Sequence, residues 1–318
     1  MINRLQTYYS FIYSLNQTKN YKGTNKLMWF ICSSIIYLLS RLILWLINCR
    51  CRCHNKPKRL NPKGHITVSL TTFPARIKKL HLVLDCLFHQ TYMPNRIVLW
   101  LSREEFTEGY DSLPENLRKY TDYGLEIKFC QNNLKPHNKY FYTFLEEEAN
   151  DVVTVDDDLL YRSDLLERLK GINQDYPSLI CANNGRIIDY EHGSFGAYSK
   201  WIDIKSQGDV VGHEILACGY GGVYYPFTFI KGFRETLCNK ESIIETSLRA
   251  DDLWLKANEI LAGIEVCVRS YYPHPITIPT TSASALSNTN RNNGATGNDD
   301  QWSHINNKFN LSKYLENK

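Results

Sequence analysis

Three consecutive aspartates directly follow a short run of β-branched residues. Residues 152–155 (VVTV) favour a buried strand, and Asp156, Asp157 and Asp158 come next. Like charges this close repel one another, so the fold must place positive or polar groups between them. Alternate carboxylates project toward one point, so Asp156 and Asp158 suit a hard divalent cation such as Mg²⁺ or Mn²⁺. Such a cation keeps coordination positions for phosphate oxygens. The triplet therefore predicts a metal that holds a phosphate, with a solvated acidic loop as the alternative.

A second acidic pair opens a predicted helix further along the chain. Asp251 and Asp252 precede the periodic segment LWLKANEIL, and Gly263 follows it as a C-terminal stop. An aspartate at a helix N-terminus caps the helix, which is worth about 0.5–2 kcal/mol, and one aspartate suffices for that. The second carboxylate is then available to accept a proton from a hydroxyl, as a general base does.

Two glycine-rich segments flank this helix in the sequence. Residues 218–227 (CGYGGVYYPF) contain Gly221 and Gly222, which permit close backbone approach, beside aromatic residues on which a sugar can stack. Residues 290–302 (NRNNGATGNDDQW) are polar and glycine-rich. They form either a mobile loop over a diphosphate or the turn before the final helix.

The motifs lie in an alternation of predicted strands and helices. The first strand ends at Thr72, Pro74 suits the first turn of the helix that follows, and Ser163 can cap a later helix. We predict strands at residues 65–72, 96–102, 125–129, 152–155 and 178–184, and helices at 75–90, 140–147, 164–173 and 251–261. Such alternation predicts an α/β fold with a mainly parallel sheet and helices on both faces. In such sheets ligands bind outside the carboxyl ends of the strands, where residues 71–76 and the aspartate triplet both fall.

The charges are distributed asymmetrically. Residues 1–60 contain ten Lys or Arg and no Asp or Glu, whereas the rest of the 318-residue chain has 27 basic and 33 acidic residues. Because the excess of positive charge is confined to one arm, we predict no nucleic-acid partner and instead an arm that faces a membrane.

An apolar segment of this arm predicts a membrane-associated helix. Residues 27–47 (LMWFICSSIIYLLSRLILWLI) are long enough to cross the roughly 30 Å hydrocarbon core, although Arg41 interrupts them. The long side chain of Arg41 can extend toward the headgroups, and a helix that lies in the interface or dips into one leaflet is the alternative. Basic residues that follow the segment favour a cytosolic body. We therefore expect an arm at residues 1–62 and a catalytic body at residues 63–318.

Six segments occur in the order seen in a known enzyme family. They are ITVSLTTFPARI, FHQTYMPNRIVLWLS, VVTVDDDLLY, GGVYYPF, ADDLWLKA and ALSNTNRNNGATGNDDQW, and together they span about residues 65–310. In these segments the chain resembles bacterial family 2-like glycosyltransferases of the GT-A fold, which act in polysaccharide or lipopolysaccharide biosynthesis. The resemblance implies a Rossmann-like half that binds a nucleotide sugar at residues 63–185 and an acceptor-binding half at 186–318. It also implies a nucleoside-diphosphate sugar held through Mn²⁺ or Mg²⁺.

The resemblance further implies roles for individual residues. Thr72, Pro74 and Arg76 occupy the turn in which these enzymes seat the nucleobase and ribose, and the alternative for Arg76 is an ordinary surface arginine. Lys139 matches a lysine near the nucleotide or its phosphates, with a solvated lysine as the alternative. Asp157 is implied as a neighbour of the metal ligands or as a ribose contact.

Two more implied roles concern the metal and the base. His274 stands where many GT-A enzymes carry a late metal ligand beside Asp156 and Asp158, although a histidine between prolines also suits a structural role. Asp252 aligns with the residue that is assigned as the base in inverting members of the family. Asp251 is then the capping or acceptor-orienting partner.

These observations predict a membrane-anchored, metal-dependent glycosyltransferase whose catalytic body faces the cytoplasm at a bacterial inner membrane. Its donor would be a nucleoside-diphosphate sugar and its acceptor a hydroxyl of a glycan or lipid-linked glycan. A sugar nucleotidyltransferase is the first alternative, but residues 71–79 (TTFPARIKK) lack the glycine-rich phosphate loop usual after the first strand of such enzymes. A catalytically inactive, glycan-binding membrane scaffold is the second. Two retained acidic motifs argue against it, because clustered charge is costly to bury.

Overall fold

A large mixed sheet forms the centre of the protein. The computed structural model describes residues 1–17, 26–52, 56–205, 208–269, 272–273, 275–278 and 297–316. The strands of the sheet, in spatial order, are β11 (Val210–Gly212), β14 (Val266–Val268), β6 (Ile180–Ala182), β13 (Val223–Tyr225), β4 (Asp151–Thr154), β1 (Ile66–Thr71), β2 (Arg96–Ser102) and β3 (Leu125–Cys130). Parallel pairing joins β3, β2, β1 and β4, and also β14 and β6. Within the described part of this central sheet only β13 and β11 run against their neighbours, so the predicted mainly parallel sheet is confirmed.

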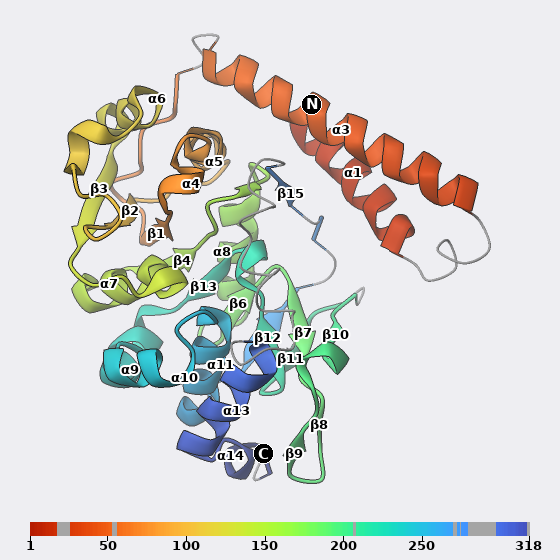
Figure 1. Cartoon of the computed structure of the whole chain (residues 1–318), viewed down its shortest axis with the longest axis vertical. Helices are drawn as coiled ribbons and strands as arrows, with labels where there is room; N and C mark the ends of the chain where they lie inside the picture. The colour runs from red at the N-terminus through yellow and green to blue at the C-terminus, as the bar shows by residue number, and fades with distance from the viewer. Residues whose placement is uncertain are drawn as a thin grey trace.

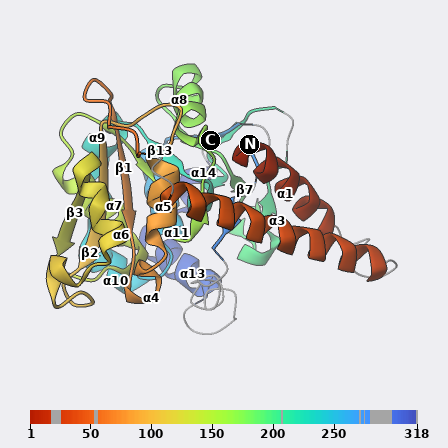
Figure 2. The ribbon, with the colours of Figure 1, turned by 90° about the horizontal axis from the view of Figure 1, so that it is seen from above.

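Helices cover both faces of this sheet, as predicted (Figures 1 and 2). The helices of the body are α4 (Pro74–Ile77), α5 (Leu80–Leu87), α6 (Glu115–Arg118), α7 (Asn138–Glu146), α8 (Leu165–Asp175), α9 (Phe227–Leu237), α10 (Lys240–Thr246), α11 (Asp251–Ala262), α13 (Asn298–Phe309) and α14 (Ser312–Glu316). Neighbouring residues of β4 point to opposite faces. Val153 lies in a buried cluster with side chains of α5 and α8, whereas Val152 lies in one with side chains of α7 and α9.

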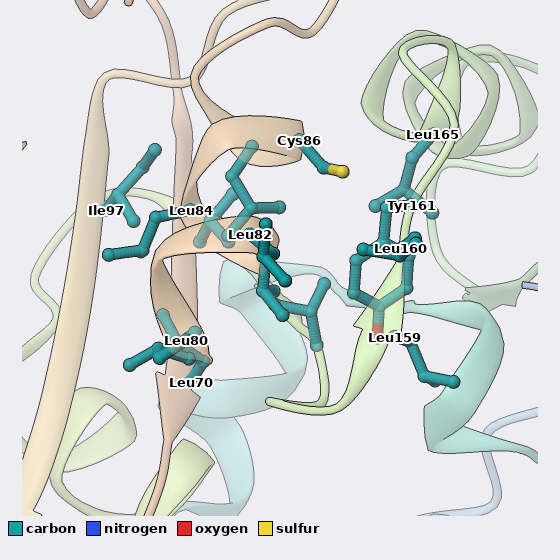
Figure 3. Close-up of a cluster of buried hydrophobic side chains, with 14 of the residues drawn as sticks. Leu70, Leu80, Leu82, Leu84, Cys86, Ile97, Leu159, Leu160, Tyr161 and Leu165 are labelled. Atoms are coloured by element: carbon teal, nitrogen blue, oxygen red, sulfur yellow. The ribbon is translucent and has the colours of Figure 1, made fainter. Parts of the chain in front are cut away.

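Small sheets extend the body around the carboxyl ends of the central strands. A three-stranded sheet has the order β10 (Ile202–Asp203), β7 (Gly185–Ile187), β12 (Ile215–Ala217), and a hairpin pairs β8 (Tyr190–Glu191) with β9 (Ser194–Phe195). Directly after the aspartate triplet, β5 (Leu159–Leu160) pairs with β15 (Ile276–Thr277). Figure 3 shows the segment Leu159–Tyr161 beside the side chains of α5, which anchors the chain that leaves the triplet.

Two local predictions are wrong. The helix expected at residues 75–90 is interrupted after Ile77, so that α4 and α5 are separate helices. Ser163 does not cap α8, because Asp164 precedes the helix without a side-chain cap. The hydroxyl of Ser163 instead accepts a hydrogen bond of 2.9 Å from the side chain of Asn3, near the start of the chain.

The N-terminal arm forms two helices that lie side by side. Helix α1 (Ile2–Gln17) was not expected, and α3 (Lys26–Arg52) contains the predicted apolar segment. The side chain of Asn16 donates to Ser33 at 3.2 Å, which links the two helices. Among the described helices, α3 is long and apolar enough to cross a membrane.

The α1–α3 pair, which we call the N-terminal hairpin, is packed on the body. Ile43 and Ile47 of α3 are fully buried in the cluster that contains the side chains of α5. The side chain of Gln6 in α1 donates to the carbonyl of Leu160 at 2.9 Å, and Arg162 donates to the Asn3 carbonyl at 3.0 Å. The remainder of the hairpin extends beyond the body in both views (Figures 1 and 2).

Candidate functional site

Side chains in the turn after β1 bind the carboxylates of two of the three aspartates. Thr72 donates its hydroxyl to Asp157 at 2.6 Å, and Arg76 forms an ion pair with the same carboxylate. A second nitrogen of Arg76 lies 3.0 Å from Asp158 Oδ2. Arg76 is buried, so the alternative of an ordinary surface arginine is wrong. Burial and the neighbouring Asp156 carboxylate nevertheless raise the pKa of Asp158 to about 7, which indicates negative charge that Arg76 does not fully offset.

Lys139 of α7 joins the two acidic motifs. Its Nζ lies 2.9 Å from Asp156 Oδ1 and 2.7 Å from Asp251 Oδ2. The lysine is only 5% exposed, so the alternative of a solvated lysine is wrong. Burial opposes its charged form, but the carboxylates of Asp156, Asp251 and Asp252 raise the pKa of Lys139 well above the ordinary value. The charged lysine thus holds together two motifs that are far apart in the sequence.

A buried histidine fixes the start of α7 against the chain that leads into α11. One ring nitrogen of His137 lies 2.8 Å from the Tyr140 hydroxyl, and the other lies 2.8 Å from the carbonyl oxygen of Ser247. Burial lowers the pKa of His137 to about 4, so the ring is neutral near pH 7. Because Ser247 shortly precedes α11, this contact sets the distance between Lys139 and Asp251.

Asp251 and Asp252 differ in charge state because their surroundings differ. Burial works to raise the pKa of Asp251, but the charged Lys139 holds it below the ordinary value. Burial and the adjacent Asp251 raise the pKa of Asp252 to about 7. Neither aspartate caps α11, which begins after Ala250 without a side-chain cap, so the predicted capping role is wrong. Asp252 instead accepts a hydrogen bond of 3.1 Å from the backbone N–H of Gly219.

The glycine segment lies directly against these charges, but the closest glycine is Gly219. A Cβ at this position would lie 2.7 Å from Asp252 Oδ1 and 2.9 Å from Lys139 Nζ, so a side chain there would have to displace one of these groups. The two glycines named from the sequence have other neighbours. Gly221 lies against the side chain of Asn184, and Gly222, with a φ of +79°, faces Leu165 in the core.

Asp156 and Asp158, the predicted metal ligands, could hold a divalent cation that takes most of its other ligands from phosphate. Lys139 contacts Oδ1 of Asp156 and Arg76 contacts Oδ2 of Asp158, so each carboxylate has a second oxygen that these ion pairs do not use. Hard oxygen donors and the raised pKa of Asp158 both favour a cation here. The described residues contain no group of three or more His, Cys, Asp or Glu side chains suited to a metal, and His274 lies outside them.

Two buried polar residues of the structure, Tyr161 and Asn184, were not predicted from the sequence. The hydroxyl of Tyr161 accepts a hydrogen bond of 2.8 Å from the backbone N–H of Asp156, and this tyrosine is buried. At the carboxyl end of β6, Asn184 has a buried Oδ1 without a hydrogen-bond partner among the described residues. A polar pair at the end of a predicted strand, Asn183 and Asn184, was the available signal. Pro74, named for the nucleotide, is the exposed first residue of α4.

Comparison with protein-family models and with characterised proteins gives no match. Among solved structures, the chain is similar to the mannosyltransferase PcManGT from Pyrobaculum calidifontis in complex with GDP-Man and Mn²⁺, with a TM-score of 0.43 and 13% identity. That likeness covers 75% of this chain and 64% of the mannosyltransferase, less than two thirds of its length. CMP:2-keto-3-deoxy-manno-octonic acid synthetase complexed with CTP is similar with a TM-score of 0.42 and 9% identity, over 71% of this chain and 98% of the synthetase. At these TM-scores neither likeness decides the activity of this chain.

Proposed function

We propose that the protein is a metal-dependent glycosyltransferase that uses a nucleoside-diphosphate sugar. The observation that carries the proposal is the contact of Lys139 with both Asp156 and Asp251. This contact brings the carboxylate pair for which we propose cation binding close to Asp252, whose pKa of about 7 suits a general base near neutral pH. A donor phosphate and an acceptor hydroxyl require such groups side by side.

In the proposed reaction the acceptor oxygen bonds to the anomeric carbon of the sugar as the bond from that carbon to the diphosphate breaks. Asp252 takes the proton from the acceptor hydroxyl, and the N–H of Gly219 orients its carboxylate. Asp156 and Asp158 would hold Mn²⁺ or Mg²⁺, which stabilises negative charge on the leaving diphosphate. Lys139 positions Asp156 and Asp251, while Thr72 and Arg76 hold Asp157.

The biological setting is part of the same proposal. The acceptor would be a glycan or lipid-linked glycan of cell-surface polysaccharide biosynthesis, and the N-terminal hairpin would hold the body on the cytoplasmic side of a bacterial membrane. The apolar composition of α3 and the absence of acidic residues from positions 1–60 support membrane association.

Product analysis separates the proposed reaction from its alternatives. The full chain with Mn²⁺, a panel of nucleoside-diphosphate sugars and bacterial glycolipids should release nucleoside diphosphate and extend the glycolipid. Release of pyrophosphate from a nucleoside triphosphate and a sugar phosphate would instead identify a nucleotidyltransferase. Glycan binding without either product would identify an inactive scaffold.

The role of Asp252 is tested by Asp252→Asn, because the amide is isosteric but cannot take the proton. Donor affinity should be unchanged, whereas the single-turnover rate should fall by about 10²–10⁴-fold. In the unchanged chain the rate should rise with pH through about 7, as Asp252 loses its proton, and the variant should lose this rise. Asp251→Asn is the control: it should keep a rise in rate, moved to lower pH because the neighbouring carboxylate no longer raises the pKa of Asp252. Near-normal transfer by Asp252→Asn would refute the assignment.

The pH dependence of folding stability provides a second test of the raised pKa of Asp252. Asp252 has a raised pKa in the folded protein, so between about pH 4 and 7 the folded state holds a proton that the unfolded chain has released. The contribution of this group to stability therefore decreases as pH rises through that window. Asp252→Asn should flatten this part of the dependence of unfolding free energy on pH.

A further inference from the structure

The end of the N-terminal hairpin exposes apolar side chains on all sides. Residues 27–31 are consecutive and apolar, and their exposed fractions range from 41% to 71%. Consecutive residues of a helix point in different directions around its axis, so no single face carries this surface. Tyr8 and Phe11 of α1 add exposed rings of 62% and 59%. A protein partner covers one side of a helix, whereas lipid surrounds it, so the surface is suited to the interior of a bilayer.

The other end of α3 belongs to the body. Ile43 and Ile47 are fully buried and Leu44 is 9% exposed. The apolar length that remains, from Leu27 to Leu42, measures about 24 Å at 1.5 Å per residue, which is less than the roughly 30 Å of a hydrocarbon core. While α3 is packed on the body, it can therefore enter one leaflet but cannot cross the bilayer as a straight helix.

Two cations line a pocket where the hairpin leaves the body. Arg41, Leu44, Trp45 and Asn48 have the spacing of one helical stripe on α3, and with Cys49 they face Lys79 across a pocket of about 390 Å³. Neither Arg41 nor Lys79 forms an ion pair with a carboxylate of the described residues. Arg41 lies over the ring of Tyr37, at 5.0 Å, and Trp45 is 60% exposed. Exposed aromatic residues beside cations are typical of the headgroup region of a membrane.

We infer that the N-terminal hairpin inserts into one leaflet of a bilayer and that Arg41 and Lys79 bind the phosphate of an anionic phospholipid headgroup in this pocket. Charge complementarity supports the choice of occupant, because Arg41 and Lys79 are the charged side chains of the pocket and no acidic side chain of the described residues lines it. Tyr37 and Trp45 would lie at headgroup level, and residues 27–31 among the acyl chains. The inference builds on the membrane association proposed above but does not depend on the transfer reaction.

Vesicle cosedimentation of the full chain tests the phosphate site. Binding should be stronger to vesicles of phosphatidylcholine with phosphatidylglycerol than to phosphatidylcholine alone. Arg41→Gln and Lys79→Gln should each weaken binding to the mixed vesicles by about tenfold or more, the usual worth of a hydrogen bond to a charged group. Lys78→Gln is the matched control, because Lys78 is exposed and lies outside the pocket, and its loss should be severalfold smaller. Equal losses in all three variants would show diffuse attraction and refute the site.

Two further measurements distinguish the source of the phosphate and the depth of insertion. Soluble glycerol phosphate should not displace the protein from mixed vesicles; displacement would show a site for free phosphate. Bromines near the ends of the acyl chains should quench Trp29 more than Trp45, as read from the variants Trp29→Phe and Trp45→Phe.

The alternative topologies have their own outcomes. With Lys26→Cys in sealed vesicles, an impermeant maleimide should fail to label position 26 from either side, as read by mass spectrometry. Labelling from the vesicle lumen would establish a full span and overturn the inference. A dimer that buries residues 27–31 and does not bind vesicles would also overturn it. None of these readouts uses a donor sugar, so their failure leaves the test of Asp252 intact.

Discussion

Lys139 is the only cation that the described ion pairs place between the two acidic motifs. Its charge offsets the carboxylates of Asp156 and Asp251, and both partners lose solvation in the fold. Removing one partner of a buried ion pair leaves an uncompensated charge, which costs more than the pair itself contributes. The residue should therefore be needed for folding as well as for the site.

Lys139→Met should lower the free energy of unfolding by about 3–5 kcal/mol, because the methionine keeps the volume of the side chain but leaves the buried carboxylates unpaired. The urea midpoint measures this loss. Lys135→Met is the control, since Lys135 is 47% exposed at its side chain and its pair with Glu105 lies at the surface. That change should cost less than about 1 kcal/mol. Equal losses in the two variants would contradict the bridging role.

At the residue scale the sequence located the acidic motifs but not their partners. A run of charge after a β-branched strand is a local signal, and so is an acidic pair before an apolar helix. Arg76 and Lys139 were singled out for the nucleotide, whereas in the structure they neutralise aspartates. The role of Tyr161 was not predicted because a tyrosine within an apolar run is typical of a buried core residue. Its hydrogen bond with the Asp156 backbone also depends on the turn between the two residues.

The loop that carries Gly219 places a backbone N–H against Asp252, the proposed general base. It is a short 3-10 turn, Gly219–Gly221, between β12 and β13. Gly219→Ala should reduce transfer by at least about tenfold, because the new Cβ must displace Asp252 or Lys139. Single-turnover transfer and the unfolding midpoint should be measured together.

The control for this change is Gly232→Ala in α9, where a new Cβ meets nothing within 4 Å. It should leave transfer unchanged and alter stability by no more than about 1 kcal/mol. If Gly219→Ala keeps normal transfer, the close approach of this turn has no part in positioning Asp252.

At the element scale, the parts governed by local pattern were predicted and the parts governed by distant contacts were not. Strands β1 and β2 and helix α11 lie where the periodicity indicated. Apolar residues keep helical spacing on both sides of Lys78 and Lys79. Nothing in the sequence therefore indicates the break between α4 and α5. Strand β13 inserts antiparallel between β4 and β6, a pairing that depends on three separate segments. Serine is a residue type that often caps helices, but the hydroxyl of Ser163 accepts a hydrogen bond from the side chain of Asn3 instead.

At the scale of the whole molecule, the hairpin is part of the packed core. A chain that begins at Lys63 loses the side chains of Ile43, Leu44 and Ile47 from the face of α5. We expect it to unfold at a lower urea concentration than the full chain, both measured in detergent. Unchanged stability would mean that the hairpin contributes nothing to the body.

Point variants provide the matched control for this truncation. Ile43→Ala removes a fully buried side chain and should cost about 2–5 kcal/mol. Its neighbour Leu42 is 42% exposed, so Leu42→Ala should cost much less. Equal costs would place both residues in the same surroundings and contradict the packing of α3 on the body.

The hydrogen bonds from Asn3 to Ser163 and from Gln6 to Leu160 impose an order on biosynthesis. At a translation rate of about 5–20 residues per second, the complete hairpin emerges from the ribosome roughly 5–21 s before β5, the strand on which it docks. During that interval the apolar residues 27–31, which stay exposed even in the folded protein, are not covered by the rest of the chain. Only a bilayer or a chaperone can shield them, so delivery of the nascent chain to the membrane would precede the folding of the body.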